Sequence, residues 1–281
     1  MSDIERQLRL HGETPFRVMV VHGGPGAAGE MAPVAQVLVS GNAGPAAGTG
    51  VSGVLEPLQT APTLAGQVEE LRAILLTHGQ PPLTVIGFSW GAWLSFLLAS
   101  QFPELVAKLI LVGSGPFEEQ YVAAISDTRR QRLDVAEREE FDTILADLER
   151  VAPERTDPDL RTKLINHLGI LANKADQYDP VADPATNAFP VEIRGELFAA
   201  WPEGAALRKS GELLAAGEQI GCPVLAIHGE YDPHPAAGVS QPLVRVIEDF
   251  RFVLLPACGH KPWIERQARE AFYRLLAAEL P

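Results

Sequence analysis

Four short stretches of the chain carry the residue types that acyl-transfer chemistry requires. They hold a serine between glycines (87–91, GFSWG), a glycine-rich turn (22–26, HGGPG), an acid (228–233, HGEYDP) and a histidine (258–263, CGHKPW). Each stretch follows a run of apolar residues typical of a buried strand. Their agreement at four strand ends favours one site over four unrelated loops.

Residues 87–91, Gly-Phe-Ser-Trp-Gly, separate an apolar run from a helical stretch. The pattern Gly-x-Ser-x-Gly in that position is typical of a nucleophile elbow, a turn so sharp that side chains at the glycines would collide with backbone. The turn exposes its serine beside the positive end of the next helix. We therefore predict that Ser89 is a nucleophile. The alternative is a structural serine in a glycine-rich turn.

Residues 22–26, His-Gly-Gly-Pro-Gly, provide a turn in which backbone N–H groups can approach a ligand closely. An acyl-transfer enzyme needs two such donors aimed at the oxyanion. We expect one from Trp90 and the other from Gly24, with Gly23 as second choice. A phosphate-binding loop is disfavoured because the pattern lacks its glycine spacing and its lysine.

The acid is predicted to follow the strand at 223–227, at the sheet edge where open parallel sheets bind ligands. Asp232 and Glu230 are both candidates. Asp232 is favoured because it lies further into the loop, just before Pro233.

The general base is predicted to be His260, since a histidine titrates near neutrality and this one follows the last predicted strand. His234 is the rival, but it would have to share one loop with the acid. The other histidines are expected in surface positions (His11, His78), on a charged helix (His167) or in structural hydrogen bonds (His22, His228).

Six apolar runs predict the buried strands that position these stretches: 17–21, 53–58, 83–88, 108–112, 223–227 and 250–255. Residues 4–10 are expected to add an antiparallel edge strand. Helical spacing at 67–77, 91–101 and 263–280 alternates with the strands. The alternation predicts the α/β class, a mostly parallel sheet of about six to eight strands with helices on both faces.

Between residues 117 and 216 the strand pattern is replaced by helical pieces at 129–151, 159–173, 189–200 and 211–219. We interpret this region as a helical cap inserted into a core made of 1–116 and 217–281. Residues 40–52 are rich in glycine, alanine and serine and are predicted to form a surface loop.

The formal net charge of −13 disfavours binding to nucleic acids and to anionic membranes. The first twelve residues lack the apolar core of a signal peptide, and no apolar run is long enough to span a bilayer. Two cysteines without a CxxC pair disfavour a disulfide framework or a zinc site. We expect a cytoplasmic protein without a metal. A homo-oligomer is compatible with the sequence but is not indicated by it.

The order serine, acid, histidine and the motifs at 22–26 and 87–91 resemble the α/β-hydrolase superfamily, and most closely its proline iminopeptidase-like branch. The resemblance implies an eight-stranded, mostly parallel sheet with a helical cap after the sixth strand. It also implies hydrolysis through an acyl-enzyme without a cofactor. Ser89, Asp232 and His260 then form the triad, and Gly24 and Trp90 the oxyanion hole.

Two features depart from that branch. Residues 55–60 (LEPLQT) stand where many relatives carry D-x-R-G-x-G-x-S, and the short N-terminus implies that the first two strands are reduced. The expected function is hydrolysis of small carboxylic esters or amides. An aminopeptidase is one alternative, with Glu196 or Glu203 holding a substrate ammonium group, and a non-hydrolytic lyase or ligand receptor is another.

Overall fold

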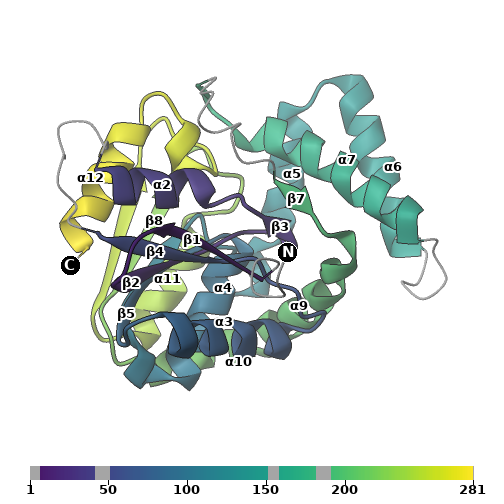
Figure 1. Ribbon diagram of the computed structural model, residues 1–281. Helices are drawn as coiled ribbons and strands as arrows, with labels where there is room; N and C mark the ends of the chain where they lie inside the picture. The colour runs from purple at the N-terminus through teal and green to yellow at the C-terminus, as the bar shows by residue number, and fades with distance from the viewer. Residues whose placement is uncertain (1–6, 42–50, 151–157, 182–190, 281) are drawn as a thin grey trace.

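The computed structural model describes residues 7–41, 51–150, 158–181 and 191–280 (Figure 1). Its main sheet has seven strands in the order β1-β4-β2-β5-β6-β8-β9. In that order the strands are β1 (Leu8–Gly12), β4 (Gly53–Pro57), β2 (Phe16–Val21), β5 (Leu83–Phe88), β6 (Val106–Val112), β8 (Val224–Gly229) and β9 (Phe250–Leu255). Only β1 is antiparallel to its neighbour, so the carboxyl ends of the other six strands share one edge.

The six predicted parallel strands are all present, with ends displaced by no more than two residues. The predicted edge strand at 4–10 is also present in kind, but it runs as β1 from Leu8 to Gly12, and residues 1–6 lie outside the described residues. The eighth strand that the family resemblance implies is not among the described strands of this sheet.

Helices cover both faces of the sheet, as the α/β pattern predicts (Figure 1). Alternate residues of each strand point to opposite faces, so Met19 and Val21 belong to one apolar core and Val18 and Val20 to the other. The first core is covered by α3 (Leu64–His78), α4 (Trp90–Gln101) and α11 (Ala237–Val246), and the second by α2 (Ala32–Ser40) and α12 (Arg269–Glu279). The sequence patterns do not predict α2 or α11.

Three helices after β6 stand apart from the sheet, and the last two share an apolar core of their own (Figure 1). They are α5 (Ala123–Arg132), α6 (Val135–Arg150) and α7 (Pro158–Asp176). The prediction of a single helix at 129–151 is wrong, because the helix is interrupted between the end of α5 and the start of α6. Asp134 caps the start of α6: its carboxylate accepts from the Glu137 N–H at 3.0 Å, and the Glu137 side chain accepts from the Asp134 N–H at 3.2 Å.

Two further helix predictions need correction. In the described part of 189–200, strand β7 (Glu192–Ile193) pairs with β3 (Ala27–Ala28), and a 3-10 turn follows at Gly195–Ala200. The helix predicted at 263–280 begins only at Arg269, because a separate 3-10 turn occupies Pro262–Ile264.

The region 211–219 is divided into α10 (Glu212–Ala215) and a 3-10 turn at Ala216–Gln219, after α9 (Trp201–Ser210). Other 3-10 turns lie at Pro103–Leu105 and Glu119–Tyr121. Most of the predicted loop at 40–52 lies outside the described residues. Among the described helices, none has the length and apolar character needed to cross a bilayer.

Candidate active site

Ser89 lies in a sharp turn between β5 and α4, with a backbone φ of 52° and ψ of −114°. Positive φ is strained for a residue with a side chain, and such strain is found at functional sites. The flanking glycines are required by contact: a Cβ on Gly87 would lie 2.4 Å from the Gly91 carbonyl oxygen, and a Cβ on Gly91 would lie 2.3 Å from that of Val21. The turn therefore has the geometry expected of a nucleophile elbow.

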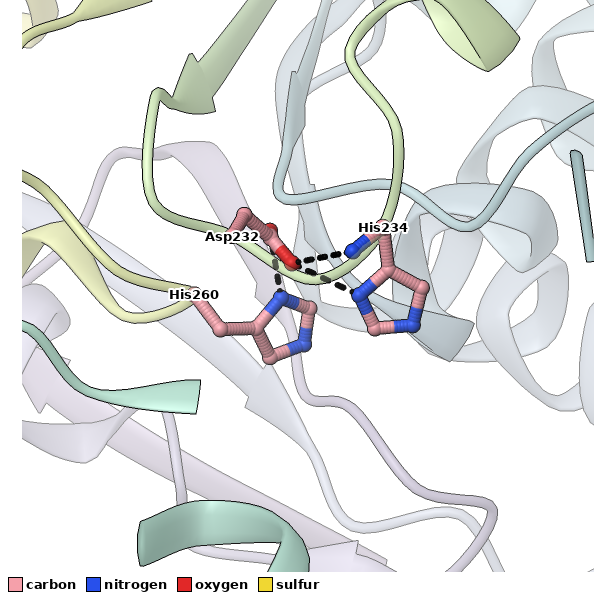
Figure 2. Close-up of side chains that lie close together, drawn as sticks. All are labelled: Asp232, His234 and His260. Atoms are coloured by element: carbon pink, nitrogen blue, oxygen red, sulfur yellow. Dashed lines mark hydrogen bonds and ion pairs between the residues drawn. The ribbon is translucent and has the colours of Figure 1, made fainter. Parts of the chain in front are cut away.

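Asp232 and His260 come from the loops after β8 and β9, and the structure brings their side chains together (Figure 2). His260 Nδ1 lies 2.7 Å from Asp232 Oδ2, and both residues are buried. Because a carboxylate only accepts hydrogen bonds, Nδ1 carries the proton and the lone pair of Nε2 is left to accept another. Glu230, the other candidate acid, is exposed.

The His260 ring packs against Phe88, the residue before Ser89, with ring centroids 4.7 Å apart. Gly113 lies on the same ring, since a Cβ there would be 3.1 Å from His260 Nδ1. The imidazole is thereby held beside the elbow. Among the described residues no hydrogen bond joins the Ser89 hydroxyl to His260. The base contacts the acid directly by a hydrogen bond, whereas it contacts the elbow through the ring of Phe88, the residue before Ser89.

His234 also binds Asp232, from the other side (Figure 2). Its Nδ1 lies 2.7 Å from Asp232 Oδ1, and its backbone N–H donates to the same oxygen at 2.9 Å. The His234 and His260 rings stack, with centroids 4.6 Å apart and planes inclined by 26°. The sequence presents these histidines as alternatives, whereas the structure places both on one carboxylate.

Asp232, His234 and His260 have the residue types of a metal site, and their ligand atoms lie within 4.8 Å of one another. The distances are nevertheless those of hydrogen bonds. Two ligands on a tetrahedral zinc ion lie roughly 3.3 Å apart, whereas each imidazole nitrogen is 2.7 Å from its carboxylate oxygen. The arrangement is that of a carboxylate orienting two imidazoles.

The electrostatics distinguish the three groups. Burial opposes charge on Asp232, but the neighbouring imidazoles of His260, His234 and His228 hold its pKa well below the usual range. Burial also opposes charge on His260, and there the Asp232 carboxylate prevails and raises the pKa. Burial prevails at His234, whose pKa is lowered. Of the two imidazoles, His260 therefore holds a proton more readily.

The other histidines divide as follows. His228 and His22 are structural, as predicted: His228 Nε2 donates to the His234 carbonyl at 2.8 Å, and His22 Nδ1 lies 2.7 Å from the Gly23 carbonyl. The prediction for His11 is wrong, because it is buried on β1 and lies 2.7 Å from the buried carboxylate of Glu56. His78 ends helix α3 instead of lying in a loop, and His167 lies on α7 near Glu140.

In the glycine-rich turn after β2, the two candidate donors for an oxyanion, Gly23 and Gly24, differ in their hydrogen bonding. The Gly23 N–H donates to Glu30 Oε2 at 3.2 Å and is therefore engaged. The Gly24 N–H has no acceptor among the described residues. Trp90 is the first residue of α4, where a backbone N–H has no acceptor within the helix. The oxyanion hole of Gly24 and Trp90 stays a prediction.

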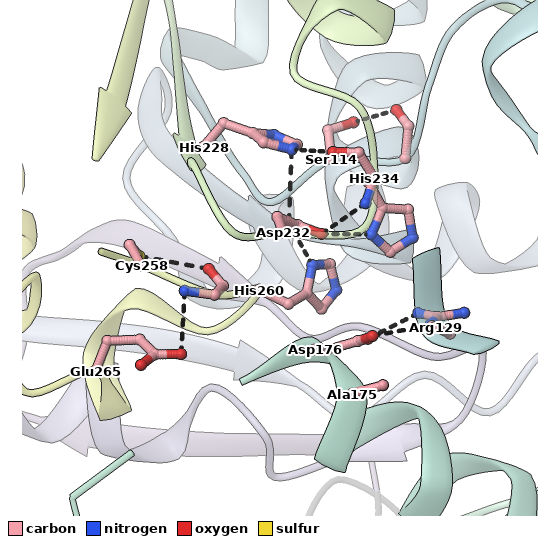
Figure 3. Close-up of polar contacts among 12 residues, drawn as sticks. Ser114, Arg129, Ala175, Asp176, His228, Asp232, His234, Cys258, His260 and Glu265 are labelled. Atoms are coloured by element: carbon pink, nitrogen blue, oxygen red, sulfur yellow. Dashed lines mark hydrogen bonds and ion pairs between the residues drawn. The ribbon is translucent and has the colours of Figure 1, made fainter. Parts of the chain in front are cut away.

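Glu265 is a buried residue of this site that sequence reasoning missed (Figure 3). Its Oε1 accepts from the N–H groups of Gly259 at 3.0 Å and Tyr178 at 2.9 Å, and its Oε2 from that of Asp179 at 2.8 Å. One carboxylate thus ties the His260 loop to the segment after α7. Its sequence context, a glutamate shortly before the last helix, carries no signal that separates it from a solvated one.

A second link comes from the end of α7 (Figure 3). The His260 N–H donates to the Asp176 carbonyl at 2.9 Å. The Asp176 carboxylate accepts two hydrogen bonds from Arg129 of α5, at 2.8 and 2.7 Å. Such a forked pair is geometrically specific, so the helices after β6 take part in fixing the backbone of the base.

Aromatic side chains surround the elbow. Trp90 and Trp93 of α4 lie with ring centroids 5.9 Å apart, and Trp201 of α9 stacks on Trp93 at 6.1 Å. Trp263 meets Phe88 edge-on at 4.7 Å. Glu203, proposed above as an ammonium ligand, instead accepts from the Leu64 N–H at 2.9 Å, at the start of α3. Glu196 is exposed.

Comparisons with known proteins agree with this architecture. The sequence pattern of the alpha/beta hydrolase fold family matches residues 46–267. A pimeloyl-[acyl-carrier protein] methyl ester esterase of Nitrosomonas europaea is 28% identical over 183 residues, which are 64% of this chain and 65% of that protein, just under two thirds of its length.

Among solved structures, VinJ superposes with a TM-score of 0.67 at 18% identity, over 98% of this chain and 95% of that one. A proline iminopeptidase of Mycobacterium smegmatis gives 0.59 at 20% identity, over 97% and 94%. At these identities the likeness concerns the fold. With the family pattern covering most of its length, the chain belongs to the alpha/beta hydrolase fold family.

Proposed function

We propose that this protein is a hydrolase, which cleaves small carboxylic esters or amides through an acyl-enzyme formed on Ser89. The observation that carries the proposal is the 2.7 Å contact between His260 and Asp232 at the sheet edge that also holds the strained Ser89 turn. In this family the three roles, nucleophile, base and orienting acid, come from these strand ends in this order.

The proposed reaction has two halves. His260 Nε2 takes the proton of the Ser89 hydroxyl as its oxygen attacks the substrate carbonyl, and the N–H groups of Gly24 and Trp90 stabilise the oxyanion. His260 then gives that proton to the leaving group. A water molecule, deprotonated by His260, attacks the acyl-enzyme, and Ser89 is regenerated as the acid departs. Asp232 stays ionised throughout and stabilises the imidazolium.

We place esters before amino-terminal amides. An aminopeptidase must bind the ammonium group of its substrate. Asp176, next to the base, is engaged by Arg129, and the candidate Glu203 is engaged by a helix N-terminus. The curated relative is named as an ester esterase. The proline iminopeptidase structure is similar at the level of fold.

The test is covalent labelling followed by kinetics. A fluorophosphonate probe should modify Ser89, located by mass spectrometry, and Ser89→Ala should abolish both labelling and turnover while its circular dichroism stays native. A burst on a p-nitrophenyl ester would indicate the acyl-enzyme. Turnover of prolyl amides and not of aryl esters would favour the aminopeptidase. Absence of labelling with a folded protein would favour a lyase or a ligand receptor and overturn the proposal.

A further inference from the structure

His234 occupies the second oxygen of the carboxylate that orients His260 (Figure 2). We propose that His234 is a positioning residue, which fixes Asp232 and weakens the pull of its carboxylate on the proton of His260. This inference rests on the proposed function, since it assigns to His260 the role of base.

The geometry fixes which group donates. A carboxylate accepts only, so the Nδ1 of His234 donates to Asp232 Oδ1 and its Nε2 carries the lone pair. The neutral ring satisfies this bond, and protonation of His234 would place a second positive charge against the stacked His260 ring. His234 therefore serves as a neutral donor when His260 becomes an imidazolium during turnover.

The same oxygen also accepts from the His234 backbone N–H at 2.9 Å. Proline stands on both sides of His234, at Pro233 and Pro235, and restricts the backbone of this loop. Two donors from one restrained residue hold Oδ1, and the carboxylate can rotate only by breaking both. Oδ2 consequently stays directed at His260.

Each hydrogen bond that a carboxylate accepts stabilises its negative charge, so the carboxylate stabilises a neighbouring cation less strongly. Removing the His234 ring would leave more charge for His260, which would then hold its proton to higher pH. The effect acts against a fixed background of other groups around the two rings: His228 (3.5 Å from Asp232 Oδ2), the Arg129–Asp176 pair, and Arg132 over Tyr231.

Two substitutions separate this role from simple packing. His234→Asn keeps a donor where Nδ1 lies, but it can neither titrate nor stack. His234→Phe keeps the ring and removes the donor. The readouts are the pH dependence of kcat/KM on an aryl ester and the NMR titration of the His260 ring, the latter also in a Ser89→Ala background.

We expect the acid limb of kcat/KM and the NMR titration of His260 to move upward in the Phe variant by about 0.5–1 pH unit, a few-fold to tenfold change in proton affinity, and to stay near wild type in the Asn variant. Equal titration in wild type and Phe variant, or a loss of kcat that is uniform with pH in both variants, would overturn the proposal.

The NMR titration tests the role of His234 independently of the proposed hydrolase activity. His260 titrates in the Ser89→Ala protein without any turnover, so a failed hydrolase assignment leaves the NMR comparison intact. Should His234→Phe not fold, His234→Ala removes the same donor and is measured in the same way, with the same upward shift expected and the same unchanged titration contradicting the role.

Discussion

The nucleophile elbow and the acid–base pair both hold a side chain at the carboxyl edge of the sheet, but by different means. The elbow is mainly local: Gly87, Ser89 and Gly91 lie within five residues, and a Cβ on Gly87 would meet the backbone of Gly91, although a Cβ on Gly91 would meet the backbone at the end of β2. The acid–base pair is assembled from distant segments, with Asp232 and His260 joined 28 residues apart. Steric contacts around one short sequence pattern therefore fix the nucleophile turn, whereas hydrogen bonds between distant segments fix the position of the base.

In the acid–base pair of Asp232 and His260, the substitution with the largest expected effect is Asp232→Asn. The amide cannot stabilise an imidazolium and can favour the wrong tautomer of His260, so kcat should fall by about 10³–10⁴-fold. Glu230→Gln is the matched control, since Glu230 is exposed in the same loop and should retain activity. Steady-state kinetics of the two variants decide, and a larger loss in the Gln variant would exchange the roles of the two acids.

In the nucleophile elbow, the substitution with the largest expected effect on folding is Gly91→Ala. The new Cβ would lie 2.3 Å from the Val21 carbonyl oxygen and 2.4 Å from that of His22. Because both atoms are backbone, relief requires the sheet edge to move, and we expect a loss of about 3 kcal/mol or more in the free energy of unfolding.

Gly169→Ala is the control for that change. Gly169 lies in α7, and a Cβ added there would meet no other part of the described chain within 4 Å. The substitution should therefore stabilise the helix by about 0.5–1 kcal/mol. Urea denaturation measures both variants. Equal stability of Gly91→Ala and wild type would show that the elbow tolerates a side chain there.

A smaller effect on the acid–base pair is expected from Glu265→Gln. The amide NH₂ would face a backbone N–H that now donates to the carboxylate, so the His260 loop should shift. Misplacement of about 1 Å at a reacting group costs on the order of 10²-fold in rate, and we expect a loss of about 10–100-fold in kcat.

Glu270→Gln is its control, because Glu270 is exposed and pairs with Arg274 one turn away. Kinetics and thermal denaturation of both variants separate a displaced base from general unfolding. Wild-type activity in Glu265→Gln would mean that the base does not depend on this link.

The smallest expected effect follows from Arg129→Met. His260 must be neutral to accept a proton, and its pKa is raised, so kcat/KM should rise with pH through a value above about 6.5. Arg129 opposes that increase in the pKa and Asp176 favours it. Removing the arginine leaves the aspartate unpaired, and the acid limb should move further upward, by less than about one unit.

Arg130→Met provides the comparison, since Arg130, the next residue of α5, pairs with Asp127 of α5 and Asp142 of α6. A pH profile with an unchanged or lowered acid limb in Arg129→Met would contradict the sign of this coupling.

The difference between the nucleophile elbow and the acid–base pair also explains what can be predicted from the sequence. Strand 83–88 is predicted with its observed bounds, because a continuous apolar run identifies a buried parallel strand. Strand 250–255 is also predicted with its observed bounds, but it lies at the sheet edge and only Leu255 in it is buried. The turn at Ser89 can be predicted equally well, since the glycines that it requires stand two residues before and after the serine in the chain. Its helix follows at once, as the pattern requires.

What could not be predicted depends on contacts between distant segments. Glu265 looks like an ordinary charged residue until the fold buries it against three backbone N–H groups. His11 looks like a surface residue until β1 pairs with β4 and sets it beside Glu56. The sequence presents His234 only as a competitor of His260, because spacing along the chain does not reveal that one carboxylate has two oxygens to share.

The aromatic side chains around the elbow give the protein an optical property. Its four tryptophans are Trp90, Trp93, Trp201 and Trp263. The first three form one group of packed rings beginning at the residue after Ser89, and the fourth meets Phe88, the residue before it. All the intrinsic indole emission therefore originates around a single turn. Acylation of Ser89 should alter the fluorescence of the whole chain, so that turnover can be followed in the unlabelled protein by stopped flow.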